Sequence, residues 1–357
     1  MTTAKWDSCI SHRGNEIDRF IAEYFALSPK CILLVGGAGF DPRASEVAAK
    51  LASSGGLIRG LFLKEERPDP SPKLVKKAQK SLENLRRAVR EHRVAKLDIF
   101  GTDGAVIGGR EAVEEIRKEK IDGITDVAVD ISALSIGTSF PIIQYLVEKS
   151  NMKKFNLHLF VSHNPDIDDA ITPNSSDVPG YVLGFKGNTE NDEAEETTKL
   201  WLPQLPKRKT SALASLHSFV EPHDICPILP FPAGDPKATD RLVAAYLNEF
   251  ENRWSVDASN IVYADESDPL DLYRTILRLG DLRKKVFAEV GGSQLVLSPL
   301  GSKVLALGAL MAAIEHDLPV AYLEAVGYEI EGECDNLGQS EMIHIWLEGD
   351  VYPLTRQ

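Results

Sequence analysis

The sequence predicts an α/β protein made of two tandem Rossmann-like halves, each with a parallel sheet, that are related by internal duplication. Two observations predict this fold: short continuous apolar runs alternate with helical segments, and four segments recur later in the chain in the same order. A continuous apolar run is typical of a parallel strand covered by helices on both faces. At 357 residues the chain is also long enough for two domains with separate cores.

The first half begins with the apolar strand CILLVGG at Cys31–Gly37, and a helix is expected from about Arg43. The segment 71–92 between two later strands is amphipathic, with apolar residues at helical spacing and bases elsewhere. Its basic face is either solvated or a lid over an anionic ligand. The other strands of this half are expected at 57–64, 94–101, 126–132 and 155–162.

The composition changes between Asn164 and Ser211, where turn-forming residues are followed by an acidic run, prolines and bases. We interpret this segment as a surface excursion and linker. The strand–turn–helix pattern then restarts at 224–247, and the tail 342–352 is expected to form an extra strand. The expected divisions are an N-terminal extension (1–27), half 1 (28–190), a linker (191–220) and half 2 (221–357).

Four pairs of segments predict the duplication. The run DPRAS at Asp41 matches DPKAT at Asp235, each at a strand-to-helix junction. Each match alone is weak, because any α/β protein supplies strands followed by helices, but four in one order favour duplication. The other three pairs, in order, are 97–116 with 260–277, 127–147 with 294–314, and 155–163 with 318–328.

Charge and apolar content exclude several classes of protein. The 53 acidic residues outnumber the 40 basic ones, which argues against general binding to a nucleic-acid backbone but leaves room for a small anion in a local basic pocket. The longest apolar run, 304–314, is about half the roughly 20 residues that cross a bilayer, and the N-terminus lacks the apolar core of a signal peptide. We therefore expect a cytoplasmic protein without membrane contact.

The four cysteines are far apart and form no Cys-x-x-Cys pair, so we expect reduced thiols and no zinc or redox motif. A second group of residues would suit a metal, although a strand followed by an Asp-rich turn gives the same pattern, and we expect no metal and no cofactor. That group comprises His158, His163, Asp166, Asp168 and Asp169.

Candidate ligand contacts lie in the loops that follow strands, because ligands of parallel sheets bind beyond the carboxyl ends of the strands. The first loop, GGAGFDPRAS, offers Gly37 and Gly39 for close backbone approach and Arg43 for an anion. Asp41 is expected to cap the next helix and would repel a phosphate placed directly on it. The loop matches neither the dinucleotide nor the Walker pattern, and a plain tight turn with Arg43 in solvent is the alternative.

The loop LGSK offers Gly301, Ser302 and Lys303 at the start of a helix. A cation in the first turn opposes the helix dipole by a few tenths of a kcal/mol unless an anion is present, although an exposed lysine explains the same letters. A strand followed by Gly-Ser-Lys and an Ala/Leu-rich helix resembles the C-terminal ligand motif of CARF domains, which sense cyclic oligoadenylates. Two such halves in one chain resemble the SAVED domain.

The resemblance covers both halves in architecture. Gly301, Ser302 and Lys303 match the motif, and Gly137, Thr138 and Ser139 match it more weakly. The family usually has Gly-Gly-Thr-Lys, so the first half lacks the lysine and one half is expected to have lost its phosphate contact. The effector domain that such sensors usually carry is also missing, so the output is expected through a partner protein.

The resemblance implies a nucleotide-sensing regulatory protein, of the cyclic oligonucleotide type, in prokaryotic antiviral defence. One alternative is an enzyme that hydrolyses or modifies a nucleotide or phosphosugar, with one of the acids Asp103, Asp130, Asp265 or Asp268 as the base. Another is a non-catalytic scaffold subunit. The oligomeric state is left open, and the catalytic residues are unknown. The expected phosphate contacts are Arg43, Thr138, Ser139, Lys237, Ser302 and Lys303, and the expected ribose or base contacts are Asp130 and Asp265.

Overall fold

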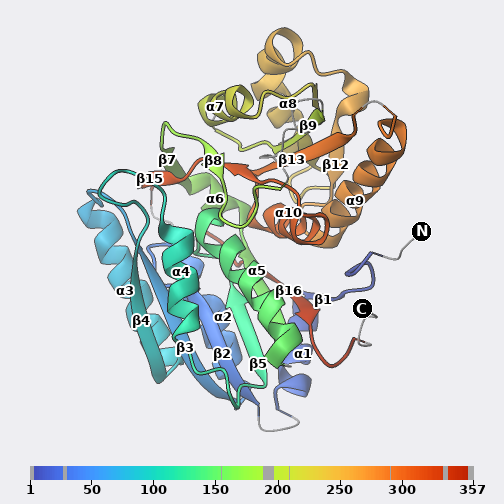
Figure 1. Cartoon of the computed structure of the whole chain (residues 1–357). Helices are drawn as coiled ribbons and strands as arrows, with labels where there is room; N and C mark the ends of the chain where they lie inside the picture. Colours follow the sequence, from blue (N-terminus) through green and yellow to red (C-terminus); the bar gives the residue numbers. More distant parts are fainter. Residues whose placement is uncertain are drawn as a thin grey trace. The chain divides into compact units, whose positions relative to one another are not determined.

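The computed structural model describes residues 4–26, 30–153, 155–187, 197–208, 210–289, 291–332 and 337–352. The chain forms two compact units. The first unit comprises residues 8–174 and 326–357, and the second comprises residues 1–7 and 175–325. Each is described by itself, with the element labels of Figure 1.

The first unit contains a seven-stranded sheet in the order β1-β16-β6-β5-β2-β3-β4. Strands β2 to β6 run parallel, whereas β16 is antiparallel to β6 and β1 is antiparallel to β16. The strands are β1 (Ile10–Arg13), β2 (Cys31–Gly37), β3 (Leu57–Glu66), β4 (Glu91–Asp98), β5 (Asp126–Asp130), β6 (Asn156–His163) and β16 (Glu341–Glu348). A separate pair joins β7 (Ile171–Ser175) to β15 (Ala325–Ile330).

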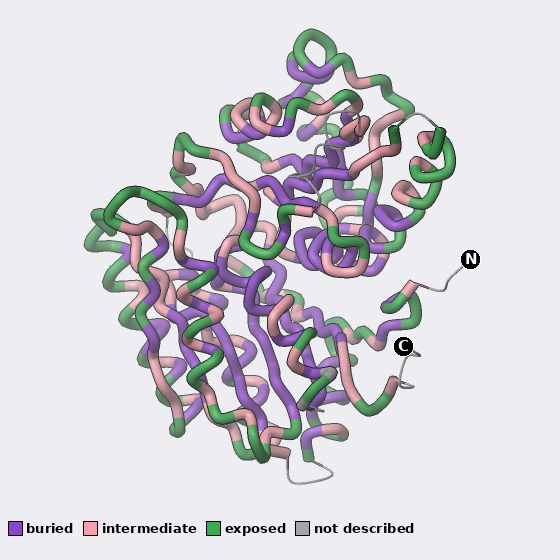
Figure 2. The backbone as a smooth tube through the Cα atoms, in the orientation of Figure 1, coloured by how far each residue is buried: buried purple, intermediate pink, exposed green. Residues whose placement is uncertain are grey.

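Helices cover both faces of this sheet, which explains why its central strands are continuous apolar runs and are buried in Figure 2. Helices α4 and α5 lie on the face toward the viewer in Figure 1. On the other face, residues of α1, α2 and α3 form one core cluster with side chains of the strands. The helices are α1 (Asn15–Tyr24), α2 (Glu46–Ala52), α3 (Pro72–Ala88), α4 (Gly108–Arg117), α5 (Ile136–Lys153) and α6 (Pro165–Ala170).

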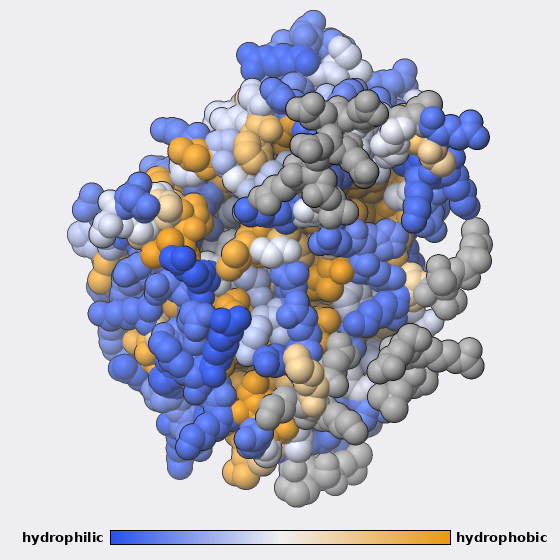
Figure 3. Space-filling model, viewed as in Figure 1, coloured by the Kyte–Doolittle hydropathy of each residue, from blue (hydrophilic) through white to orange (hydrophobic). Residues whose placement is uncertain are grey.

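Helix α3 is the amphipathic helix expected at 71–92. Its buried residues include Leu74, Leu82 and Leu85. Hydrophilic side chains predominate over α3 and α4 in Figure 3. The polar face of α3 is therefore solvated, and its apolar face packs into the core.

The second unit has a smaller sheet in which β9 is central. Strands β10 and β11 pair with β9 on one side and β12 follows them; β13 pairs with β9 on the other side, and all are parallel. Val320, the residue just before β14, forms a parallel bridge with Leu297 of β13. Strand β14 itself pairs with β8. The strands are β8 (Gly180–Tyr181), β9 (Thr198–Gln204), β10 (Asp224–Ile225), β11 (Ile228–Pro230), β12 (Val262–Ala264), β13 (Ser293–Pro299) and β14 (Ala321–Tyr322).

Among the described residues, four α-helices connect these strands, and the first of them, eleven residues long, follows β9. A buried cluster that includes Trp201, Tyr246 and Trp254 lies against one face of the sheet. The helices are α7 (Thr210–Val220), α8 (Ala238–Asn248), α9 (Pro269–Val286) and α10 (Lys303–His316). Among the described residues, no helix is both long and apolar enough to cross a lipid bilayer.

The structure confirms an α/β fold with Rossmann-like, mostly parallel sheets. The parallel strands of both sheets share one order: the first parallel strand is central, the second and third follow on one side, and the fourth and fifth on the other. This shared order agrees with three of the four matched segment pairs. The duplication itself stays a prediction.

The match of DPRAS with DPKAT is wrong by one strand. The first run follows β2, the first parallel strand of its sheet, whereas the second follows β11, the second strand of its sheet. The first strand of the second sheet is β9, which lies inside the predicted linker 191–220. An acidic run and prolines flank this short apolar run, and this composition favours a loop in the sequence pattern.

The boundaries of the units also differ from the predicted ones. The extra strand expected at 342–352 is confirmed as β16, but it extends the sheet of the first unit. The predicted extension 1–27 supplies β1 to the same sheet and α1 to the helices that cover it. The chain therefore returns to the first unit after completing the second.

Candidate functional site

The carboxyl edge of the first unit's sheet brings together most of the residues selected in this half. Gly37 ends β2, Asp130 ends β5, and Thr138 and Ser139 lie in the first turn of α5. An added Cβ at Gly37 would lie 2.5 Å from the carbonyl oxygen of Ala133. Close packing of two backbone segments therefore requires this glycine. Gly39 follows in the same loop with more space around it.

Arg43 is held by the chain's own carboxylates. Its guanidinium lies 2.8 Å from Asp41 Oδ2 and 2.7 Å from Asp168 Oδ1, and its Nε donates to Asp41 Oδ1. The residue is only 3% exposed. The expectation that Arg43 lines an open cleft is therefore wrong, because a buried ion pair neutralises its charge. Asp41 caps the turn at Pro42–Ser45, as expected.

The amino end of α5 receives an internal anion. Glu65 Oε1 accepts the backbone N–H of Ser135 at 2.9 Å, and Arg67 pairs with Glu65 Oε2 at 2.8 Å. Burial alone would raise the pKa of Glu65, but Arg67 and the Ser135 N–H outweigh it and lower the pKa. A carboxylate therefore stands where a helix amino end would bind a phosphate.

The hydroxyls of Thr138 and Ser139 are also used within the chain. Ser135 Oγ donates to Thr138 Oγ1 at 3.0 Å, and Ser139 Oγ donates to the carbonyl oxygen of Ser135 at 2.7 Å. Both residues are buried. Their hydroxyls therefore bond within the first turn of α5, and the expected phosphate contacts at these two positions stay a prediction that these internal bonds do not favour.

Asp130 is a buried carboxyl group at this edge with a raised pKa. Its Oδ1 accepts the backbone N–H and the hydroxyl of Ser132. Burial raises the pKa of Asp130 to about 7, and the nearby carboxylates of Glu46 and Asp41 add to the effect. A carboxyl group with such a pKa can exchange a proton near neutral pH.

In the second unit, α10 begins directly beyond the carboxyl end of β13. Ser302 caps the helix, because its Oγ accepts the backbone N–H of Leu305 at 3.3 Å, and Lys303 is the first helical residue. Gly301, Ser302 and Lys303 are all partly exposed. The three residues selected from the sequence therefore lie together, at a helix amino end where backbone N–H groups favour an anion.

Sequence reasoning missed Gln204, which lies beside this helix start. Its Nε2 donates to the carbonyl oxygen of Leu305 at 3.0 Å, and a Cβ added at Gly301 would lie 3.3 Å from its Oε1. Within the described part of the chain, that buried Oε1 accepts no hydrogen bond. The apolar run before Gln204 was the signal that could have placed it at the end of a parallel strand.

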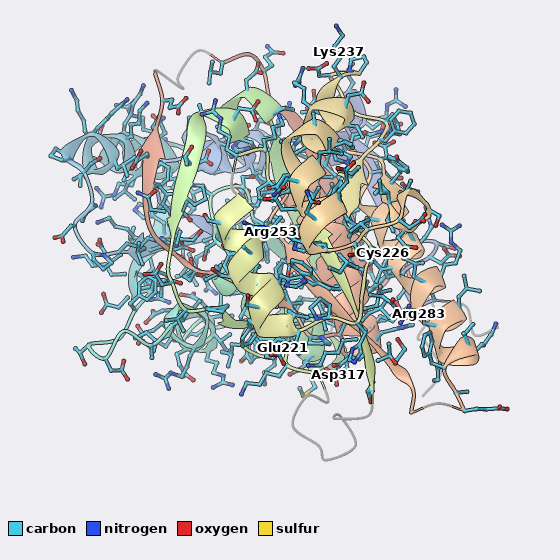
Figure 4. All side chains as sticks on the ribbon, turned by 90° about the horizontal axis from the view of Figure 1, so that it is seen from above. Glu221, Cys226, Lys237, Arg253, Arg283 and Asp317 are labelled. Atoms are coloured by element: carbon cyan, nitrogen blue, oxygen red, sulfur yellow. The ribbon has the colours of Figure 1, made fainter. Side chains whose placement is uncertain are left out.

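The described contacts of Lys237 and Asp265 are within their own loops and the helices that follow them, and not with the start of α10. Lys237 is exposed at the start of α8, and Figure 4 shows it at the outer margin of its unit, pointing outward. Asp265 Oδ1 accepts the N–H and the hydroxyl of Ser267, both at 2.8 Å. Glu266, the next residue, accepts the N–H of Gly234 with its Oε2 at 3.0 Å. Carboxylates of the chain therefore occupy these loops too.

Residues of the group suggested as a metal site have other contacts in the structure. Asp168 pairs with Arg43, and the side chain of Asn164 caps α6 beside Asp166. In the described ranges, no three His, Cys, Asp or Glu side chains are placed to hold a metal ion. Three cysteines, Cys9, Cys31 and Cys226, form no disulfide, and Cys334 lies outside the described residues.

Comparisons with known proteins show only distant likeness. No protein-family model and no curated protein matches the chain. The "delta-N METTL16 MTase domain" is 13% identical, with 45% of this chain and 74% of that chain covered and a TM-score of 0.23. The cytoplasmic domain of a prokaryotic cation chloride cotransporter is 10% identical, with 84% and 96% covered and a TM-score of 0.23.

A third solved structure is UGT2 of Phytolacca americana, complexed with UDP-2fluoro-glucose and pterostilbene. It is 11% identical, with 84% of this chain and 81% of that chain covered and a TM-score of 0.26. Scores this low carry no argument about what this chain binds.

Proposed function

We propose that the chain is a regulatory protein that binds a nucleotide-type anionic ligand at the amino end of α10. Gly301, Ser302 and Lys303 would contact a phosphate there, through backbone N–H groups, a hydroxyl and an ammonium group. The observation that carries this proposal is the contrast with α5, which follows the fourth parallel strand of its own sheet just as α10 does. At α5 an internal carboxylate, Glu65, already accepts an N–H group.

Gln204 supports a ligand larger than a free phosphate. Its buried Oε1 is an acceptor that has no donor in the described part of the chain. An unsatisfied buried acceptor costs about 1–3 kcal/mol, so a donor from a ligand or a water molecule is expected beside it. The amino group or ring N–H of a nucleobase is such a donor.

The cyclic oligonucleotide type of ligand, the setting in prokaryotic antiviral defence and the signal to a partner protein are supported by the resemblance to CARF and SAVED domains. The residues of that resemblance are Gly301, Ser302 and Lys303. Because α5 lacks a lysine at the matching position and uses its hydroxyls internally, the proposed contact involves the second unit alone.

A thermal-shift screen of mono-, di- and cyclic nucleotides tests the proposal. A ligand at 100 times its Kd should stabilise the folded chain by about 2.7 kcal/mol. Lys303→Ala should remove that stabilisation, and the matched variant Lys284→Ala, an exposed lysine of α9, should keep it. If no nucleotide raises the melting temperature, the non-catalytic scaffold becomes the better account.

A second candidate function is an enzyme that hydrolyses or modifies a nucleotide or phosphosugar, and the pKa of Asp130 favours it. Chromatography of the ligand after incubation separates the two functions, because a sensor returns its ligand intact. Turnover by the unmodified chain that is lost in Asp130→Asn would favour the enzyme. An unchanged ligand with a raised melting temperature would favour the sensor.

A further inference from the structure

Three histidines form a continuous hydrogen-bonded row across adjacent strands of the first unit. His12 Nδ1 lies 3.0 Å from His344 Nδ1, and His344 Nε2 lies 3.0 Å from His158 Nδ1. His158 Nε2 lies 3.2 Å from Asp126 Oδ1, which ends the row. The strand order β1-β16-β6-β5 places the four residues next to one another, and His12 is the direct partner of His344 in the pairing of β1 with β16.

The row runs from the surface into the core. His12 is partly exposed and lines an open groove of about 500 Å³, together with Glu16 and Arg19 of α1. His344 and His158 are fully buried. Phe20 stacks on both His12 and His344, with ring centroids 4.4 and 4.5 Å apart. The rings are therefore fixed in place, and a change in charge has to be met by moving protons.

The number of protons that the row can hold follows from its geometry. Each of its three links joins two acceptor atoms, so each needs exactly one proton. Three neutral imidazoles and one carboxylate supply three protons, which fill the three links. Among the described residues, His12 Nε2 is the only ring nitrogen of the row outside these links. One extra proton fits there, and a second would put two protons into one link.

We propose that His12, His344, His158 and Asp126 form a proton-uptake site that accepts one proton from the groove at His12 Nε2 and shares it along the row. Moving the proton in each of the two histidine–histidine links, while the third proton stays on His158 Nε2, transfers the positive charge from His12 to His158. There it lies beside the carboxylate of Asp126, with no displacement of heavy atoms. A further proton has to break a link, and the link between β1 and β16 is the one nearest to solvent.

The surroundings act on the protonation of the row in both directions. Burial raises the pKa of Asp126, but hydrogen bonds from His158, Thr125 and Tyr24 outweigh it and lower the pKa, so the carboxylate stays ionised. Burial lowers the pKa of His158, His344 and His12. The other charged groups that act on the row are Glu16 on His12, and Lys30 and Asp350 on His158.

The pH titration of the imidazole NMR signals in the full-length chain tests the proposal. The signals of all three rings should move in one common step, and together they should account for one proton. Three steps at separate pH values, or no step before the chain unfolds, would overturn the shared site.

Two variants separate the row from ordinary buried histidines. His12→Phe keeps the stack on Phe20 but moves the unlinked ring nitrogen from the groove to His344 Nδ1, in a fully buried residue, so the step of His344 and His158 should vanish from the pH range in which the chain is folded. Asp126→Asn removes the negative end, so the step should move to lower pH. His92→Gln, at a histidine whose Nδ1 contacts the backbone carbonyl oxygens of Val89 and Arg90, is the control and should leave the step unchanged. A step that persists in His12→Phe, or that stays at the same pH in Asp126→Asn, contradicts the proposal, and either variant decides alone.

Discussion

The guanidinium of Arg43 pairs with two carboxylates, and one of them, Asp41, is only 8% exposed. Arg43→Met would leave that carboxylate buried without its cation. The free energy of unfolding should fall by about 3–5 kcal/mol, measured by urea denaturation. Arg241→Met removes an exposed pair with Asp235 and should leave the unfolding curve unchanged. A tolerated Arg43→Met would mean that the pair is not buried in solution.

The raised pKa of Asp130 makes stability depend on pH in a defined direction. Because the folded-state pKa is about 7 and the ordinary value is 3.8, the folded chain holds a proton that the unfolded chain has lost between these pH values. The contribution of Asp130 is therefore present at low pH and is lost as pH rises toward 7. Relative to Asp130→Asn, the unmodified chain should lose about 1.4 kcal/mol of unfolding free energy per pH unit in this range. Parallel stability curves for the two chains would refute this pKa.

At the scale of elements, two helical glycines of the second unit have opposite roles. A Cβ added at Gly308 of α10 would overlap the carbonyl oxygen of Pro269 and lie 3.2 Å from Leu272 Cβ. A Cβ added at Gly280 of α9 would meet only ordinary contacts, at 3.7 Å and beyond. Glycine at position 308 therefore permits the close packing of α10 on α9.

Gly308→Ala should destabilise the chain by about 1–3 kcal/mol, because overpacking outweighs the better helix propensity of alanine. Gly280→Ala should instead stabilise it by about 0.5–1 kcal/mol through that same propensity. Chemical denaturation of the two variants side by side measures both changes. Equal effects at the two positions would show that α9 and α10 do not pack as described.

Local patterns predicted most of the elements, because a strand covered on both faces has to be apolar along its whole length. They failed for β9, whose central place depends on pairing with β10, β11 and β13. The cluster of Gly301, Ser302 and Lys303 was predictable because its residues are consecutive. The burial of Arg43 was not, since one of its partners, Asp168, lies 125 residues further along the chain.

At the scale of the whole molecule, two sheets with one order of parallel strands differ at the start of the helix that follows the fourth parallel strand. In the first unit, Glu65 accepts the Ser135 N–H before α5. In the second, Ser302 and Lys303 begin α10, and the acceptor of Gln204 is unsatisfied in the described part of the chain. The proposed function therefore assigns an anion to a local site of a chain whose formal charge is −13.

Calorimetric titration with the nucleotide that stabilises the chain most is the measurement that tests the central claim most directly. The proposed site predicts that Lys303→Ala abolishes the heat of binding, whereas Ser139→Ala, at the matching position of α5, binds with the affinity of the unmodified chain. Unchanged binding by Lys303→Ala, or equal loss in both variants, would contradict the claim that the ligand contacts the amino end of α10.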